Sequence, residues 1–278
     1  MISQVRKLLF EAACLGLLAA LLSIGANATG YSFAAQNNGQ LTPMQRELER
    51  QSQRLKSDDI EERRDALMRL GNLKRPDASR IAAAGLTDVA PIVRVAATHA
   101  ILALPPAEAA TLLLPLLQDK LEFVRRETAY ALGETRSHSA APPLESILFN
   151  DKETSVQAAA AVALGDIGAE SSVKSLSQVL SGQSEKKKKS KARSNEFVMR
   201  AAAHSLGQIK SRSGVEVLVA TLTNDSNDSD VRREAATALG LIGDSSAVPA
   251  LQAAFTSGDP YLSEAARDAL RRIRANKN

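Results

Sequence analysis

The stretch Val231–Ile242, VRREAATALGLI, decides the fold because close copies of it recur along most of the chain. When Val231 is called position 1, apolar side chains occupy positions 1, 5, 8, 9 and 12, a spacing that gathers them on one face of a helix. Gly240 falls at position 10, where we expect the helix to approach its end. The stretch therefore predicts an amphipathic helix that needs neighbours to bury its apolar face.

The same twelve-residue frame fits at six other places in the chain. Position 1 is then Glu62, Val93, Val124, Val156, Val198 or Leu262, and the steps between successive frames are 31, 31, 32, 42, 33 and 31 residues. Position 5 is Ala or once Thr, and position 9 is Leu or once Ile, a combination that allows neighbouring helices to approach closely. A second apolar pattern precedes each frame, as at Val215, Leu218 and Leu222. A period in the low thirties with two helices predicts an all-α, right-handed α-solenoid of about seven helix-turn-helix repeats.

These repeats resemble the HEAT-repeat family, and in particular the short bacterial HEAT-like repeat of the phycobilisome lyase type. The resemblance is carried by an Asp in the turn, then Val-Arg, then Ala-Leu-Gly, which reads here as Asp119, Val124-Arg125 and Ala131-Leu132-Gly133. It covers roughly residues 43 to 275. It implies a solenoid that binds partners, and because some similar repeats belong to lyases or chaperones that attach bilins, it also implies a bilin lyase or chaperone-like alternative.

The N-terminal segment has the pattern of a secretory signal. Arg6 and Lys7 precede an apolar run from Ala12 to Ile24, and Ala26-Asn27-Ala28 has the small-x-small pattern of a cleavage site. Residues 1–28 are therefore interpreted as a signal peptide, residues 29–42 as a flexible spacer and residues 43–278 as the solenoid. We expect an exported protein, periplasmic or secreted, and the alternative is a membrane anchor formed by an uncleaved N-terminal segment.

The 42-residue step holds an insertion at residues 181–194, SGQSEKKKKSKARS, whose like-charge run predicts disorder. Its cations form a candidate loop for an anionic surface: Lys186, Lys187, Lys188, Lys189, Lys191 and Arg193. The alternative is a solvated loop. The whole chain has a formal net charge of +4, and without the net +5 of residues 185–193 it would be −1 (4 − 5). Because the basicity is local and no aromatic residue interleaves with the lysines, nucleic acid is not an expected partner.

No catalytic or metal-binding constellation is visible in the sequence. It contains no HExxH, no CxxC, no GxSxG and no glycine-rich phosphate loop, and the histidines His99 and His204 belong to repeats two and five. We therefore expect no catalytic residue, no metal site and no cofactor. The arginines at position 2 are Arg63, Arg94, Arg125 and Arg232, and the regular Asp five residues before position 1 favours turn-to-turn hydrogen bonds over a basic ladder for partners.

Positions 3 and 7 predict an exposed stripe along the second helix of each repeat, on the concave face. The candidate partner-binding ridge consists of Arg64, Met68, Arg126, Tyr130, Arg200, His204, Arg233 and Thr237. Arg and Tyr are enriched in binding hot spots, and the alternative is a solvated, salt-bridged helix face. Phe123, Phe197 and Tyr261 directly precede position 1, where we expect them to plug the turn against the next repeat, with a partner pocket as the alternative.

These features together predict an exported, non-catalytic scaffold or adaptor that binds a protein or peptide along the concave face of a solenoid. Two alternatives stay open. One is the bilin lyase or chaperone-like role, against which the export signal argues, because such proteins work in the cytoplasm. The other is an envelope-tethering module that acts through the Lys-rich loop.

Overall fold

The computed structural model describes residues 41–182 and 192–276, and the side chains of 192–195 are not part of that description. Fourteen α-helices, joined by turns and short 3-10 helices, make up these residues, which contain no strand. The described helices all belong to one compact unit, Thr42–Asn278. The predicted all-α solenoid is confirmed for this unit.

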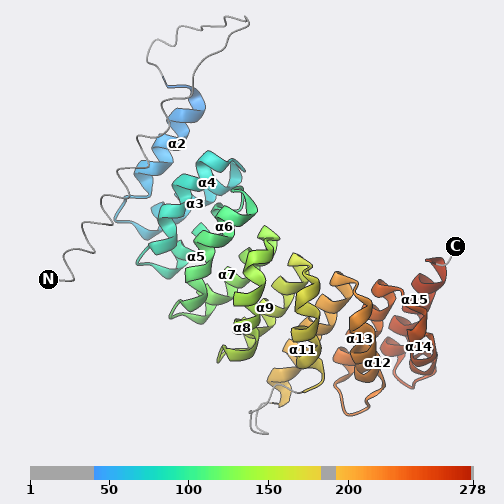
Figure 1. Cartoon of the computed structure of the whole chain (residues 1–278). Coiled ribbons are helices and arrows are strands. Elements are labelled where there is room, and N and C mark those ends of the chain that lie inside the picture. The colour runs from blue at the N-terminus through green and yellow to red at the C-terminus, as the bar shows by residue number, and fades with distance from the viewer. Residues whose placement is uncertain (1–40, 183–191, 277–278) are drawn as a thin grey trace, which may run out of the picture. The chain divides into compact units, whose positions relative to one another are not determined.

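The helices form seven pairs that follow one another in chain order (Figure 1). The first helices of the pairs are α2 (Pro43–Arg54), α4 (Pro76–Ala82), α6 (Pro106–Leu113), α8 (Ala141–Asn150), α10 (Val173–Leu180), α12 (Val215–Thr223) and α14 (Val248–Phe255). The second helices are α3 (Ile60–Asn72), α5 (Pro91–Ala100), α7 (Glu122–Thr135), α9 (Thr154–Ile167), α11 (Ala192–Ile209), α13 (Ser229–Ile242) and α15 (Pro260–Ala275). Each second helix packs against its own first helix, and the second helices of successive pairs pack against one another from α3 to α15.

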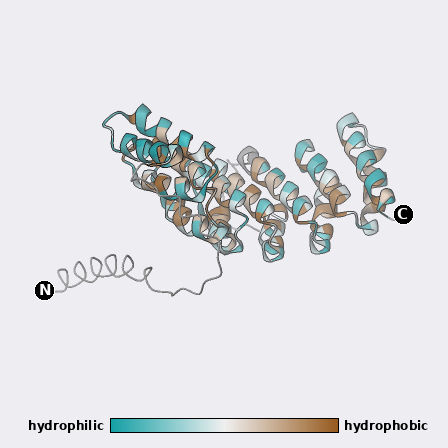
Figure 2. Ribbon diagram, turned by 90° about the horizontal axis from the view of Figure 1, so that it is seen from above, coloured by the Kyte–Doolittle hydropathy of each residue, from teal (hydrophilic) through white to brown (hydrophobic). Residues whose placement is uncertain are grey.

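The core is shared between neighbouring repeats and runs along the whole unit. All seven position 5 residues, from Ala66 to Ala266, are fully buried, and so are the position 9 residues of the first six repeats, from Leu70 to Leu239. Figure 2 shows the result as hydrophobic and hydrophilic segments on the same helices. The predicted frame is therefore the buried face of each second helix.

The glycine at position 10 has a different role from the predicted one. A Cβ at Gly240 would lie 2.7 Å from the Cα of Ala269, and a Cβ at Gly133 would lie 2.8 Å from the Cα of Ala163. In each case the glycine of one second helix meets the small residue at position 8 of the next. The glycine thus permits contact between helices and does not end one.

Most second helices end three residues later, at position 13, where the backbone is left-handed. Gly168 and Gly243 occupy this position with φ of 71° and 77°, and Lys74, Arg136 and Lys210 adopt it with φ between 50° and 58°. A left-handed residue at this place closes the last turn of a helix. Helix α13 ends at Ile242, two residues after Gly240, so the predicted end near Gly240 is confirmed, and the residue that closes the helix is Gly243.

The prolines and the insertion lie at helix boundaries. Pro76, Pro142 and Pro249 stand in the first two positions of α4, α8 and α14, where proline fits a helix because no backbone N–H is needed there. Near Pro115, α6 gives way to a 3-10 helix over Leu114–Gln118, because proline interrupts the hydrogen bonding of an α-helix. Helix α11 begins at Ala192, so the backbone of the last three residues of the predicted insertion is helical.

The predicted signal peptide, the predicted spacer up to residue 40 and the cations from Lys186 to Lys191 lie outside the described residues, and so does the side chain of Arg193. Across the described ranges, every helix is too short or too polar to cross a lipid bilayer.

Gly240→Ala is expected to lower the free energy of unfolding by about 1–3 kcal/mol, because the new methyl group meets backbone atoms of Ala269 that cannot move aside cheaply. The intrinsic gain from placing Ala in a helix, up to about 1 kcal/mol, offsets only part of this cost. The measurement is urea unfolding followed by circular dichroism. Gly258→Ala is the control, since a Cβ there meets nothing within 4 Å, and an equal effect of the two substitutions would contradict the close-contact explanation.

Candidate functional site

A ladder of buried ion pairs holds the turns of the first repeats in place. Arg125 donates to both carboxylate oxygens of Asp151 in the next repeat, from Nε at 2.7 Å and from Nη2 at 2.9 Å. Its third nitrogen, Nη1, donates to the backbone oxygen of Asp119 at 2.9 Å. Arg63 with Asp88 and Arg94 with Asp119 repeat the two-bond arrangement.

The preferred interpretation of the position 2 arginines, turn-to-turn hydrogen bonding, is confirmed for Arg63, Arg94 and Arg125. Arg232 differs, because it bonds within its own repeat, to the backbone oxygen of Leu222 and to Asp225. The turn-facing ends of α3, α5 and α7 are therefore held by arginines whose donors are already used.

The ladder depresses the pKa of its carboxyl groups. Hydrogen bonds from Arg63 hold the pKa of Asp88 below its ordinary value. For Asp151, burial raises the pKa, but the hydrogen bonds from Arg125 and from the backbone N–H of Glu153, with the nearby positive charges, outweigh it and the net pKa is lowered. A depressed folded pKa means that these pairs stabilise the fold above the ordinary carboxyl pKa and lose that contribution as the pH falls through the folded pKa.

The eight ridge residues lie on the exposed side of the second helices, as positions 3 and 7 predict. Met68 is 54% exposed, and the side chains of Arg200 and His204 are 47% and 46% exposed. Tyr130 and Thr237 are half-buried. The structure thus places the predicted residues on one succession of adjoining helices, α3, α7, α11 and α13, with α5 and α9 between them.

The ridge arginines are each paired with a carboxylate. Arg64 pairs with Glu61 at 2.9 Å, and Arg126 pairs with Glu122 at 3.3 Å and with Glu127 at 3.1 Å. Arg200 reaches Asp230 in the next repeat at 3.6 Å, and Arg233 pairs with the same Asp230. These ion pairs match the alternative of a salt-bridged helix face. Exposed pairs of this kind are weak, about 0–1 kcal/mol each, so the arginines can exchange partners at little cost.

Histidines at position 7 link successive repeats, which the sequence interpretation missed. His204 Nδ1 lies 2.9 Å from Glu234 Oε1, and His99 Nε2 lies 3.8 Å from Glu127 Oε2. In both cases the glutamate is at position 4 of the following second helix. The sequence pattern that indicates such a contact is a His followed by a Glu 30 or 28 residues later. The hydrogen bond to Glu234 raises the pKa of His204 above its ordinary value and outweighs the opposing effect of burial.

Two of the three aromatic residues before position 1 are exposed, against the prediction that they plug the turns. Phe197 is 59% exposed and Tyr261 is 67% exposed, whereas Phe123 packs on the core. The guanidinium carbon of Arg200 lies 5.6 Å from the centre of the Phe197 ring, and that of Arg233 lies 5.3 Å from the centre of the Tyr261 ring. These rings stand beside position 3 arginines, one in the same helix and one in the preceding repeat, and so extend the ridge surface.

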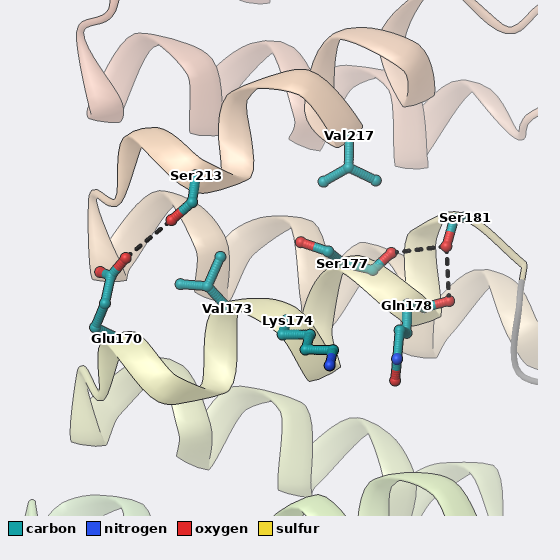
Figure 3. A pocket seen from close by; sticks show the side chains of 8 residues that line it. All are labelled: Glu170, Val173, Lys174, Ser177, Gln178, Ser181, Ser213 and Val217. Atoms are coloured by element: carbon teal, nitrogen blue, oxygen red, sulfur yellow. Dashed lines mark hydrogen bonds between the residues drawn. The ribbon is translucent and has the colours of Figure 1, made fainter.

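Hollows are present on both sides of the unit. A groove of about 360 Å³ lies between α3 and α5 and is lined by ridge residues Arg64 and Met68 together with Ile92 and His99. A cleft of about 540 Å³ lies between α10 and α12, on the side of the first helices, where Glu170 accepts a hydrogen bond from Ser213 at 2.9 Å (Figure 3). No group of three or more metal-ligating side chains occurs in the described ranges.

Comparison with known proteins identifies the repeat. The family model for HEAT repeats matches residues 49–133, 122–190 and 190–271. Among solved structures, the YibA protein of E. coli is similar at 18% identity and a TM-score of 0.55, covering 83% of this chain and 82% of that chain. No curated protein sequence matches significantly.

Two further solved structures are similar at lower TM-scores. The complex of CpcE and CpcF of phycocyanin lyase from Nostoc sp. PCC7120 has 24% identity and a TM-score of 0.48, covering 90% of this chain and 94% of that chain. Human deoxyhypusine hydroxylase in complex with glycerol has 19% identity and a TM-score of 0.40, covering 83% and 96%. At TM-scores below 0.5, neither likeness bears on the function of this chain.

Arg125→Met is expected to destabilise the protein by roughly 3 kcal/mol, because it leaves the Asp151 carboxylate buried without its partner. The neighbouring Arg126→Met is the matched control and is expected to cost less than about 1 kcal/mol, since its side chain is 36% exposed and its pairs are weak. Chemical unfolding of both variants at pH 7 measures the difference. Similar losses for the two variants would show that the ladder does not hold the turns.

His204 is expected to titrate above its ordinary pKa of 6.5 in the folded protein, and Glu234→Gln is expected to bring the midpoint down. The pair therefore stabilises the fold fully below the unfolded pKa and loses this contribution as the pH rises through the folded pKa. NMR titration of the His204 ring protons in both proteins is the measurement. Identical midpoints would mean that Glu234 does not perturb the imidazole.

Proposed function

The chain belongs to the family of HEAT-repeat proteins, and from this premise we propose that it is an exported, non-catalytic scaffold that binds a protein or peptide partner along the second-helix face. HEAT repeats commonly mediate protein–protein interaction, and stacked repeats provide extended surfaces for it. The proposal concerns the face that carries the ridge, because the turn-facing ends of the first repeats are occupied by the Arg–Asp ladder.

One observation carries the binding role: large side chains of the kinds that dominate binding hot spots are exposed on adjoining second helices. Phe197 and Tyr261 are more than half exposed, and both lie next to ridge arginines. Arg and Tyr are enriched among residues whose loss weakens interfaces most, and a large exposed aromatic side chain gains free energy when a partner covers it. The weak ion pairs of the ridge leave its arginines able to turn to a partner.

The non-catalytic and exported parts of the proposal rest on the sequence. It holds no recognisable nucleophile, phosphate or metal motif, and it begins with the basic, apolar and small-residue pattern of a signal peptide. Cleavage after Ala28 would give a purified protein that begins at Thr29, whereas an uncleaved anchor would leave the chain intact in the membrane fraction. N-terminal sequencing of the purified protein distinguishes the two.

The other two roles stay predictions. Nothing in the described geometry favours a bilin lyase or chaperone-like role, and the likeness to the lyase complex is one of fold alone. The envelope-tethering role depends on a Lys-rich segment that lies almost wholly outside the described residues. The protein-binding ridge is the candidate for which exposed side chains can be named.

Arg126→Glu combined with Arg200→Glu is expected to abolish partner capture, because each change reverses a charge in the middle of the ridge. The measurement is affinity capture from an envelope extract with the chain from Thr29 onward as bait. Arg80→Glu combined with Arg212→Glu is the matched control: both arginines are exposed and ion-paired, but they lie on the side of the first helices.

Retention of the partner by the ridge variant would reject the proposed binding face. A bait that lacks residues 183–193 tests the Lys-rich segment separately. Loss of the partner with this deletion alone would support the tethering role over the scaffold.

A further inference from the structure

The second helices of the last three repeats, α11, α13 and α15, carry a distinct surface. These helices pack against one another in succession, α11 on α13 and α13 on α15. Phe197 and Arg200 belong to α11, Arg233 to α13 and Tyr261 to α15, and we call these four residues the aromatic–arginine patch. Both rings are more than half exposed, so the patch is open to a partner.

Each guanidinium group of the patch stacks on an aromatic ring. Arg200 lies over Phe197 with 5.6 Å between the guanidinium carbon and the ring centre, and Arg233 lies over Tyr261 at 5.3 Å. A stacked guanidinium uses its face for the ring, and its N–H donors, which lie in its plane, stay available at the edge. This arrangement reduces the entropy that an arginine loses when it binds a carboxylate with two hydrogen bonds.

The patch has fewer carboxylates than guanidinium groups. Asp230 is the single carboxylate within 4 Å of either arginine in the described part of the chain, and both arginines share it. The link from Arg200 is long, 3.6 Å, and joins side chains that are 47% and 46% exposed. Two of the neighbouring acids are engaged elsewhere: Glu234 with His204 and Glu264 with Arg267. Glu196, one helical turn before Arg200, forms no ion pair within 4 Å in the described part of the chain. The arrangement thus leaves Arg200 capable of accepting a carboxylate from outside.

We infer that the aromatic–arginine patch binds an extended acidic segment of a protein partner, whose carboxylates pair with Arg200 and Arg233 while its backbone crosses α11, α13 and α15. This inference rests on the proposed scaffold function and names the chemistry of its partner. Packed helices lie about 8–10 Å apart, and an extended chain rises about 3.3 Å per residue. In an extended chain every second side chain points to the same side. The two carboxylates that face the patch are therefore expected two or four residues apart in the partner.

Exposed rings also stack on nucleotide bases, but this patch favours carboxylates. One face of each ring is already taken by a guanidinium, which leaves less aromatic surface for a base. Single-stranded DNA therefore enters the test as a competing ligand.

The test uses protein purified after expression of the full chain and a fluorescein-labelled twelve-residue peptide, (Gly-Glu-Ser-Glu)₃, in fluorescence anisotropy at low salt. The Glu peptide is expected to bind, and the same peptide with Gln in place of Glu is expected not to bind. Arg200→Ala is expected to weaken binding about tenfold, the value of one lost charge-assisted contact. Phe197→Ala is expected to weaken binding as well, because Arg200 then loses the ring against which its guanidinium is stacked. Arg212→Ala removes an equally charged, 88% exposed side chain from the side of the first helices and should leave the affinity unchanged.

Four results would overturn the inference: no binding, equal binding of the Glu and Gln peptides, equal losses for Arg200→Ala and Arg212→Ala, or tighter binding of a dT oligonucleotide of twelve residues. The proposed function is tested separately. If a captured partner is lost with the ridge charge reversal although the peptide test fails, the scaffold function stands and the acidic segment is the wrong partner chemistry. If the capture is also insensitive to the ridge, both proposals fail.

Discussion

The close approach of successive second helices is the constraint on which the rest of this structure depends. At Gly133, Gly165, Gly207 and Gly240 there is no room for a Cβ, because small residues of the next helix occupy the space. This close approach helps to seal the aliphatic side chains at position 9 from water. The same approach brings charged groups of neighbouring repeats within reach of one another, as in Arg200 with Asp230 and His204 with Glu234. Arg64 and Arg126 instead pair within their own helices.

The Arg–Asp ladder and the ridge show two uses of the same residue type. Two adjacent arginines in α7 differ in burial and pairing. Arg125 is buried and joined to Asp151 by two hydrogen bonds, whereas Arg126 is partly exposed and forms ion pairs with two glutamates. A buried pair fixes geometry, because losing one partner leaves a desolvated charge. An exposed pair fixes little, so it can be replaced during binding. The distinction separates the residues that shape the solenoid from those that can serve a partner.

The sequence predicts the features that depend on local periodicity and misses those that depend on a neighbour. The buried frame follows from helical spacing alone, so the sequence predicts that the position 5 residues from Ala66 to Ala266 are buried. The left-handed helix ends cannot be predicted in this way, because the conformation is adopted by Lys74, Arg136 and Lys210 in addition to two glycines. The exposure of Phe197 and Tyr261 and the His204–Glu234 contact depend on which residues an adjoining repeat places opposite them. Such pairs are some thirty residues apart and have no local signal.

The glycine contact has a consequence for how proteins of this design change length. Because position 10 of one helix meets position 8 of the next by the same rule at almost every junction, one whole repeat can be added or removed while each remaining surface still finds a matching neighbour. A gain or loss of a few residues inside a helix would destroy the match. The extra segment of repeat five stands in the sequence ahead of the frame that begins at Val198, so its added length leaves the match intact. Such a chain can therefore change length by any number of residues in its turns, but along the stack only by whole repeats.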